Sequence, residues 1–280
     1  MRCFFVHAKT VESRQKTRYD TDMEFRPCID IHNGQVKQIV GSTLHDKRTK
    51  ENFVSKQDAA YYARLYKEDG LTGGHVILLN PKGTPEYEAD MAAAISALQA
   101  YPNGLQVGGG IDDTNAAAFL AAGASHVIVT SYVFNNGQIC YNRLDKLRTV
   151  AGPEHIVLDL SCRRVPEGGY RIVTDRWQKF TDAFLTADLL AELSAWCDEF
   201  LVHAVDVEGK VNGIEEEVVR IIKDSPIPVT YAGGISFLAD LERIRELSDG
   251  KVNATIGSAL SLFGGTLDYQ EVLQCIRSWS

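Results

Sequence analysis

The sequence predicts a closed (β/α)8 barrel, an α/β fold in which eight parallel strands alternate with eight helices. Three observations support this fold class. Short apolar runs alternate with amphipathic stretches from Met23 onward. The length of 280 residues is normal for one such barrel. Glycine-rich and acid-bearing segments of the first half also recur in the second. A doubly wound open sheet is the structural alternative.

Eight short apolar runs mark the expected strands. They cover residues 25–31, 74–79, 104–108, 126–130, 155–160, 199–204, 227–231 and 253–257. Each is followed by a stretch whose apolar residues have helical spacing, and these stretches cover 57–68, 85–100, 113–122, 138–150, 187–197, 214–223, 237–248 and 266–279. A helix after every strand implies a parallel sheet. Because no Pro/Gly/Ser-rich linker divides the chain, we expect one barrel domain over 23–280.

Residues 1–22 do not fit the barrel pattern. They include five Lys or Arg residues and three acids, with no apolar stretch after residue 6. The segment lacks the apolar core of a secretory signal, although a transit peptide is compatible with its basic, Ser/Thr-bearing composition. We interpret it as a disordered extension, or as a start assigned too far upstream with Met23 the true start.

Composition excludes several classes of protein. A net charge of −8 argues against a nucleic-acid-binding surface, and no apolar run approaches the roughly 18 residues that span a membrane. None of the six cysteines forms a C-x-x-C pair, so we expect reduced thiols in a reducing compartment. The sequence therefore predicts a cytoplasmic protein that binds neither nucleic acid nor membrane, and we expect a monomer.

An internal repeat divides the barrel into two halves. VGGGI (107–111) is echoed by YAGGI (231–235), VIVTS (127–131) by ATIGS (254–258), and PCIDI (27–31) by IVLDL (156–160). The offsets are 124, 127 and 129 residues, in the same order along the chain. We therefore expect two half-barrels of four strands, each with one acid and one glycine-rich turn.

The two repeated acids are the candidate catalytic residues. Because strand side chains alternate, Cys28 and Asp30 share one face, and Val157 and Asp159 share another. Both acids lie near strand C-termini, where barrel enzymes place their catalytic groups. Strands one and five of a duplicated barrel are diametrically opposed, so the carboxylates should face each other as a general acid and a general base. The alternative is that each acid only caps a loop or pairs with a nearby cation.

The glycine-rich turns are candidate phosphate sites. Glycines let the backbone approach an anion closely, and a following helix start offers free N–H donors. The strand that comes after each turn ends in a further pair of donor residues. The predicted phosphate-binding set is Gly109, Gly110, Thr130 and Ser131 in the first half, and Gly233, Gly234, Gly257 and Ser258 in the second. Two such sites on opposite sides imply a long bis-phosphate substrate, and tight-turn requirements are the alternative explanation of the glycines.

Other motifs give weaker signals. His203, Asp206 and Glu208 match no common metal-ligand spacing, so we expect polar residues of the barrel mouth rather than a metal site. Trp177 lies in a long loop after strand five, where its ring could stack on a planar base, and ordinary packing within the loop is the alternative. Trp177, His203 and Asp206 are therefore possible substrate contacts.

Seven segments together resemble one family, ProFAR isomerase (phosphoribosylformimino-5-aminoimidazole carboxamide ribotide isomerase) of histidine biosynthesis. The similarity extends over about the whole chain from Met23, and is greatest to the branch typical of eukaryotes and a minority of bacteria. The segments are CIDIHNGQVKQIVG, LQVGGGI, VIVTS, VLDLSCR, FLVHAVDVEG, YAGGI and GSALSLFGG.

The resemblance implies an Amadori rearrangement of an aminoaldose to an aminoketose, without a metal or organic cofactor. Carried over from the family, Asp30 is the base that takes the C2 proton, and Asp159 is the acid that opens the ribose ring. Two carboxylates coupled through one substrate can exchange these roles, and we expect an elevated pKa on the acid. The common bacterial form has a Thr-Asp dipeptide after strand six, where this chain has HAVDVEG, so His203 and Asp206 are the candidates for the supporting role of the Thr.

Three alternative functions remain open from sequence. The cyclase of imidazole glycerol phosphate synthase shares the duplicated barrel, although the TDRWQK segment and HAVDVEG favour the isomerase. A phosphate-binding barrel without catalysis would serve as a regulator, but the two placed acids argue against it. Activity on phosphoribosylanthranilate is a third possibility, and nothing in the sequence decides it.

Overall fold

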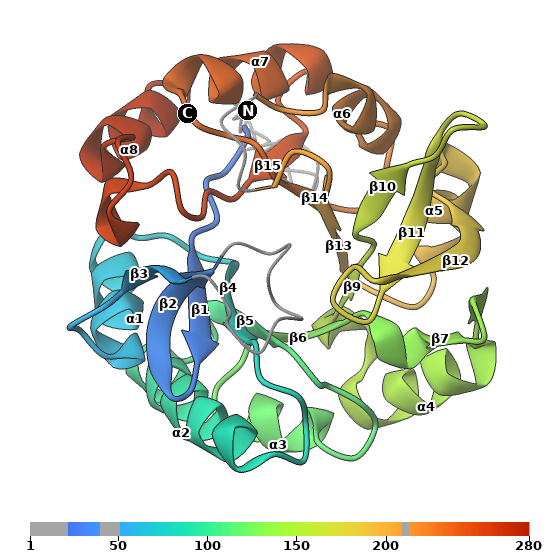
Figure 1. Ribbon diagram of the computed structural model, residues 1–280, viewed down its shortest axis with the longest axis horizontal. Coiled ribbons are helices and arrows are strands. Elements are labelled where there is room, and N and C mark those ends of the chain that lie inside the picture. Colours follow the sequence, from blue (N-terminus) through green and yellow to red (C-terminus); the bar gives the residue numbers. More distant parts are fainter. Residues whose placement is uncertain (1–21, 40–50, 209–212, 280) are drawn as a thin grey trace, which may run out of the picture.

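The computed structural model describes residues 22–39, 51–208 and 213–279, and these form a barrel of strands surrounded by helices (Figure 1). The interpretation of residues 1–22 as an extension or a misassigned start falls outside the described residues, except for residue 22. Eight strands run parallel around the barrel: β1 (Cys28–His32), β4 (Gly74–Leu78), β5 (Leu105–Gly108), β6 (His126–Val129), β9 (Ile156–Asp159), β13 (Glu199–His203), β14 (Val229–Ala232) and β15 (Val252–Ala254).

A short parallel contact closes the barrel. The sheet runs β15-β14-β13-β9-β6-β5-β4-β1, and a bridge between Phe25 and Ala254 joins its two ends. The N–H of Arg26 donates to the Ala254 carbonyl at 2.8 Å, and the Ala254 N–H donates to the Glu24 carbonyl at 3.0 Å. The predicted (β/α)8 barrel is therefore confirmed, and an open sheet is excluded.

Eight α-helices form the outer ring in Figure 1. They are α1 (Ala59–Glu68), α2 (Pro85–Ala100), α3 (Ala116–Ala121), α4 (Tyr141–Ala151), α5 (Ala187–Leu193), α6 (Glu216–Ile222), α7 (Leu238–Ser248) and α8 (Tyr269–Arg277). Local signals set several boundaries. At the start of α2, the Thr84 side chain accepts a hydrogen bond from the N–H of Tyr87. Pro85 occupies the first turn, where its missing N–H costs nothing.

Two apolar layers hold the barrel together. The larger layer lies between strands and helices and includes Ile29 and Ile31, which are fully buried. A small inner cluster of Ile128, Val157, Leu201 and Ala232 fills the barrel. Because strand side chains alternate, Val157 points inward two residues before Asp159, so this cluster forms the floor beneath the acid.

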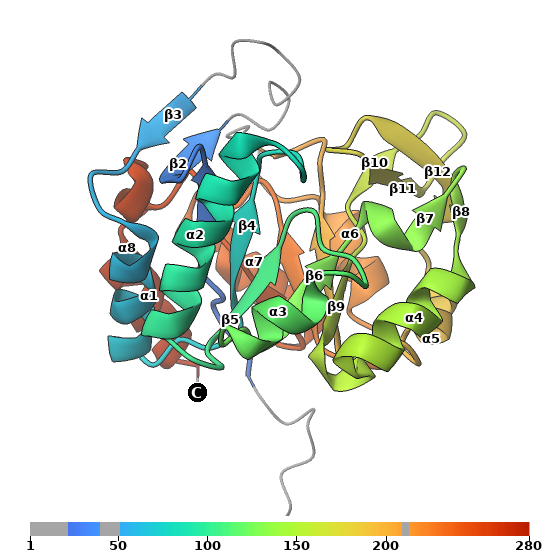
Figure 2. The same cartoon turned by 90° about the horizontal axis from the view of Figure 1, so that it is seen from below.

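Additional antiparallel strands rise from one end of the barrel, at the top of Figure 2. β2 (Gln35–Ile39) pairs with β1 and with β3 (Glu51–Val54), and β7 (Phe134–Asn135) pairs with β8 (Gln138–Ile139). The prediction of one long loop after strand five is wrong, because this segment forms strands. β10 (Cys162–Arg164), β11 (Tyr170–Thr174) and β12 (Lys179–Phe184) form a three-stranded sheet there.

Among the described residues, no helix is both long and apolar enough to cross a bilayer. The cysteines described there, Cys28, Cys140, Cys162, Cys197 and Cys275, are free thiols.

Candidate active site

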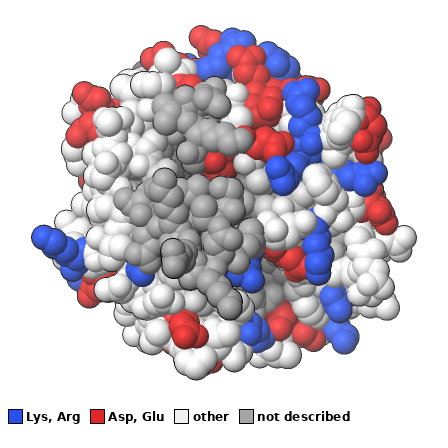
Figure 3. Space-filling view, viewed as in Figure 1, with Lys and Arg blue, Asp and Glu red and all other residues white. Residues whose placement is uncertain are grey.

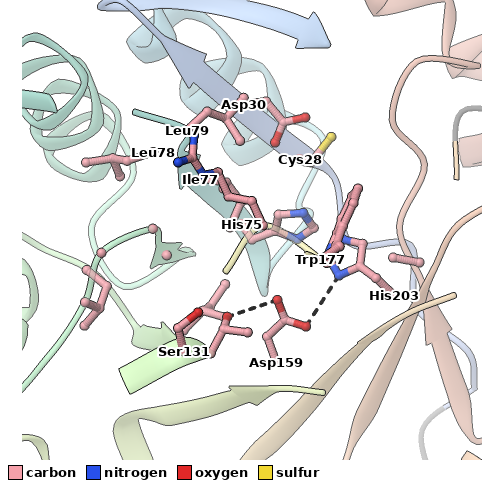
Figure 4. A pocket seen from close by; sticks show the side chains of 18 of the residues that line it. Cys28, Asp30, His75, Ile77, Leu78, Leu79, Ser131, Asp159, Trp177 and His203 are labelled. Carbon is pink, nitrogen blue, oxygen red and sulfur yellow. Dashed lines mark hydrogen bonds and ion pairs between the residues drawn. The ribbon is translucent and has the colours of Figure 1, made fainter. Parts of the chain in front are cut away.

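A cavity of about 410 Å³ opens at the C-terminal ends of the barrel strands. Asp30, Asp159, Trp177 and His203 all line it (Figure 4). The location follows from the fold, because the loops after the strands surround this end and leave the strand termini accessible.

The two predicted acids face the cavity from opposite sides. Asp30 lies on β1 and Asp159 ends β9, and these strands are four positions apart in a closed ring of eight. Figure 4 shows the two carboxylates on opposite sides of the cavity. The side chains therefore have the arrangement predicted from the repeat, with room for a substrate between them.

The Asp30 carboxylate is held by one side chain from the first hairpin. Nε2 of Gln38 donates to Asp30 Oδ2 at 2.9 Å. Burial raises the pKa of Asp30 to about 6, and the negative charge of Glu208 adds to the rise. The Gln38 hydrogen bond and the charge of His203 oppose it. Asp30 is thus a carboxyl group that can change protonation near neutral pH.

Asp159 has a richer set of partners. Its Oδ1 accepts from the N–H and hydroxyl of Ser161 at 2.9 and 2.7 Å, and its Oδ2 accepts from Thr130 Oγ1 at 3.2 Å. Burial by itself raises the pKa of Asp159, but His203 and Ser161 outweigh burial and lower it below its usual value. The expected elevated pKa on this acid is therefore wrong, because donors compensate the buried charge.

His203 lines the cavity beside Asp159. Its Nδ1 lies 3.6 Å from Asp159 Oδ1, a length that makes the contact an ion pair rather than a hydrogen bond. Burial lowers the pKa of His203, but the adjacent Asp159, with further negative charge from Glu208 and Asp30, raises it overall. The pair therefore favours an ionised carboxylate beside a protonated imidazole.

Trp177 covers His203 from a backbone turn of unusual conformation. The two rings lie 5.8 Å apart at an interplanar angle of 47°. Asp175, Arg176 and Trp177 have φ values of 52°, 57° and 66°, three consecutive non-glycine residues in the left-handed region. That conformation costs roughly 1–2 kcal/mol per residue, so other contacts must hold the turn in place.

The glycine-rich turns have backbones that other residues could not adopt. Gly109 has a φ of 97°, and a Cβ there would lie 2.1 Å from the Leu78 carbonyl oxygen. Gly234 has a φ of 75°, and its Cβ would lie 2.2 Å from the Gly213 carbonyl oxygen. Of the predicted phosphate-binding residues, six line the cavity: Gly109, Gly110, Thr130, Ser131, Gly233 and Gly257.

Three predicted site residues do not line the cavity: Gly234, Ser258 and Asp206. Asp206 Oδ1 accepts from Arg163 Nε at 3.0 Å, and Oδ2 accepts from the Arg164 N–H at 2.8 Å. Its carboxylate thus fastens β10 to the loop after β13. Of the two candidates for the role of the bacterial Thr, the geometry favours His203.

Sequence reasoning missed several polar residues that line the cavity, among them Gln38 and His75, whereas Glu208 was expected among the polar residues of the barrel mouth. His75 shares a strand face with Ile77, so alternation along β4 could have found it. Burial lowers the pKa of His75 to about 3, with a further decrease from His203, which keeps this imidazole neutral. Burial raises the pKa of Glu208. No sequence signal indicated Gln38 as a site residue.

Comparison with known proteins places this geometry in a family. A family model described as histidine biosynthesis protein matches residues 24–268. The chain belongs to the histidine biosynthesis protein family. Membership confirms the resemblance carried by the two acid-bearing strands and the glycine-rich turns, and it agrees with the barrel fold.

Three curated relatives carry the name 1-(5-phosphoribosyl)-5-((5-phosphoribosylamino)methylideneamino) imidazole-4-carboxamide isomerase. A chloroplastic protein of Medicago truncatula is 56% identical over 258 residues, covering 90% of this chain and 81% of the relative. A Neurospora crassa protein is 49% identical, with 86% and 93% covered. A Saccharomyces cerevisiae protein is 46% identical, with 87% and 94% covered. These plant and fungal sources confirm the eukaryote-like branch.

Proposed function

We propose that this chain is a ProFAR isomerase, which converts an aminoaldose carrying two phosphoribosyl groups into its ribulosyl isomer. The single observation that supports this function best is the opposition of Asp30 and Asp159 across one cavity, with the glycine-rich turns that follow β5 and β14 on the two sides between them. An isomerase of this kind needs a proton delivered at one point of the sugar and removed at another, and the two sides of the cavity can supply both.

Asp30 acts as the base. With a pKa of about 6 the group is mostly ionised at neutral pH, yet basic enough to accept a proton. Once the ribose ring is open, the C1 atom is bonded to nitrogen as an iminium. Asp30 then removes the C2 proton, the C–H electrons form a C1–C2 double bond, and the iminium nitrogen is neutralised. Tautomerisation of this enaminol places the carbonyl at C2 and completes the ketose.

The acid is the Asp159–His203 pair rather than Asp159 alone. Asp159 has a lowered pKa, so it is ionised at neutral pH and carries no proton to give. The raised pKa of His203 lets the imidazolium hold that proton. Proton transfer to the ring oxygen breaks the C1–O bond as the nitrogen lone pair forms the iminium. Asp159 stabilises the cation before transfer and orients the ring.

The two ends of the cavity are assigned to the two phosphates. Gly109, Gly110 and Ser131 line it on the first-half side, and Gly233 and Gly257 line it on the other. Trp177 lies between them beside His203, where its face can stack on the imidazole carboxamide of the substrate. This arrangement matches a long molecule with one phosphate at each end, which is the shape of the proposed substrate.

Incubation of the purified chain with ProFAR alone tests the function. We expect the ketose to form without ammonia or a glutaminase partner, as followed by absorbance and by product mass. A failure to convert ProFAR would contradict the isomerase assignment. Conversion of the ketose in the presence of ammonia would instead indicate the cyclase. Parallel assays with phosphoribosylanthranilate test the breadth of substrate choice.

The absence of macromolecular partners and a monomeric state are also part of the proposal. On the face in Figure 3, basic and acidic side chains lie next to one another around β10–β12 and α6. Arg164 pairs with Glu217 at 2.9 Å, and Arg243 pairs with Glu216 at 2.8 Å. Such pairing leaves no uniform basic stripe on that described surface. Sedimentation at micromolar concentration tests the monomer, since a dimer would contradict it.

Cytoplasmic location is a further proposal, supported by the free thiols of the described cysteines. The plant relative is chloroplastic, so residues 1–22 need a direct test. We expect a full-length fluorescent fusion and one starting at Met23 to distribute alike in the cytoplasm. Organellar accumulation of the full-length fusion alone would identify residues 1–22 as a targeting segment.

A further inference from the structure

We propose that Ser131 is a positioning residue, which links phosphate binding at the end of β6 to the placement of Trp177. The inference rests on the proposed function in one respect, because it assumes a substrate phosphate at the first-half turn. It goes beyond that function by connecting one end of the substrate to the aromatic ring over its centre.

A single hydrogen bond makes the connection. The backbone N–H of Asp175 donates to Ser131 Oγ at 2.9 Å, although the two residues are 44 positions apart in sequence. Ser131 begins the short 3-10 helix η2 (Ser131–Val133) directly after β6. Asp175 begins the turn between β11 and β12. The bond therefore joins the barrel rim to the added three-stranded sheet.

The turn that receives this bond needs external support. Asp175, Arg176 and Trp177 all have left-handed backbones, which for residues other than glycine persist only where surrounding contacts hold them. The turn aims Trp177 into the cavity beside His203. Loosening of the turn would thus move the Trp177 ring away from the catalytic imidazole.

The Ser131 hydroxyl can serve the turn and a phosphate at once. A serine hydroxyl has one proton to donate and two lone pairs that accept. With the Asp175 N–H on a lone pair, the proton is available for a phosphate oxygen beside Gly109 and Gly110, which line the same cavity. Hydrogen bonds in such a chain strengthen one another. Phosphate binding should therefore tighten the turn and settle Trp177 over the cavity.

The internal repeat supplies a matched control. Ser258 occupies the position in the second half that Ser131 occupies in the first. Within the described residues, no hydrogen bond connects Ser258 to the turn that bears Trp177. A Ser258→Ala variant therefore removes a predicted phosphate donor without touching the proposed link.

Acrylamide quenching of Trp177 fluorescence tests the link in the full-length chain. The sequence has three tryptophans, so Trp196→Phe and Trp279→Phe leave Trp177 as the sole emitter. We expect Ser131→Ala to raise the quenching constant of the ligand-free chain roughly two- to fivefold, on the scale of one lost hydrogen bond. Inorganic phosphate should lower quenching in the parent and in Ser258→Ala, but not in Ser131→Ala. Ser131→Thr keeps the hydroxyl and should restore the parent response.

Steady-state kinetics with ProFAR adds a second readout. If Ser131 positions Trp177, Ser131→Ala lowers kcat roughly three- to tenfold and also raises KM, whereas Ser258→Ala, at a residue outside the cavity lining, changes kcat by less than about twofold. Equal quenching of Ser131→Ala and Ser258→Ala, with and without phosphate, would overturn the proposal, as would a parent chain that does not respond to phosphate. A parent that fails to isomerise ProFAR refutes the proposed function instead, and the quenching comparison still decides the link.

Discussion

Nδ1 of His203 lies 3.6 Å from Oδ1 of Asp159, so imidazole and carboxylate form one unit on the side of the cavity opposite Asp30. The ion pair explains how Asp159 stays ionised although buried, and why the His203 pKa lies above its ordinary value. In the proposed mechanism, the proton acceptor therefore lies on β1 and the proton carrier lies between β9 and β13.

Replacement of His203 should alter the alkaline side of the pH–rate profile. Activity requires protonated His203, so it should fall as pH rises through the raised pKa of this group. We expect His203→Asn to lower kcat about 100-fold and to remove that limb. The profile of kcat/KM measures both effects. His155→Asn, at the opposite end of β9, is the control, and an unchanged alkaline limb in His203→Asn would rule out His203 as the acid.

Removal of the Gln38 hydrogen-bond donor should shift the acidic limb of the pH–rate profile. Asp30 must be ionised to act as a base, so activity should rise as pH rises through about 6. The Gln38 hydrogen bond favours the ionised form, and Gln38→Leu should therefore raise the Asp30 pKa and shift the limb upward by roughly one pH unit. Gln270→Leu, an exposed change on α8, should leave the limb in place. A shift to lower pH would contradict the assignment.

Asp30 should lower the stability of the fold at neutral pH. Its pKa is about 6 in the folded chain against an ordinary value of 3.8, so the folded state binds the proton more tightly. Stability therefore falls as pH rises from about 4 through 6, by up to roughly 3 kcal/mol. Asp30→Asn should raise the urea midpoint at pH 7.5 but not at pH 4. An equal rise of the urea midpoint at both pH values would show that ionisation of Asp30 is not the cause. The same rise in the exposed variant Asp224→Asn would show this too.

Alanine substitutions at Gly109 and Gly83 distinguish the cost of a steric clash from the cost of backbone strain. Both have positive φ, but a Cβ at Gly109 meets the Leu78 carbonyl at 2.1 Å, whereas a Cβ at Gly83 meets nothing within 4 Å. We expect Gly83→Ala to cost about 1 kcal/mol of unfolding free energy, and Gly109→Ala to cost at least twice that and to raise KM. Urea melts and kinetics measure this, and similar behaviour of the two variants would contradict a tight turn at Gly109.

The sequence predicted the barrel and the acid pair because both depend on periodic signals. Alternation placed Asp30 and Asp159 on inward faces, and the repeat of about 127 residues placed their strands on opposite sides. Strand and helix positions agree with the structure to within a few residues, since each amphipathic stretch buries one face against the sheet.

The sheet β10–β12 and the cavity residue Gln38 escaped prediction for physical reasons. The turn from Asp175 to Trp177 contains no Asn-Gly or Gly-containing hairpin signal, because three non-glycine residues adopt the left-handed backbone there. Gln38 reaches Asp30 from a hairpin strand outside the barrel repeat. The lowered pKa of Asp159 depends on Ser161 and His203, whose approach only the folded chain defines.

The rate of ProFAR conversion by Asp30→Asn and Asp159→Asn tests the central claim, acid–base catalysis across the cavity, most directly. We predict that the parent converts ProFAR without ammonia, and that each variant lowers kcat at least 100-fold while its circular dichroism matches the parent. Asp224→Asn should convert at the parent rate. Conversion by Asp30→Asn within tenfold of the parent would contradict the account.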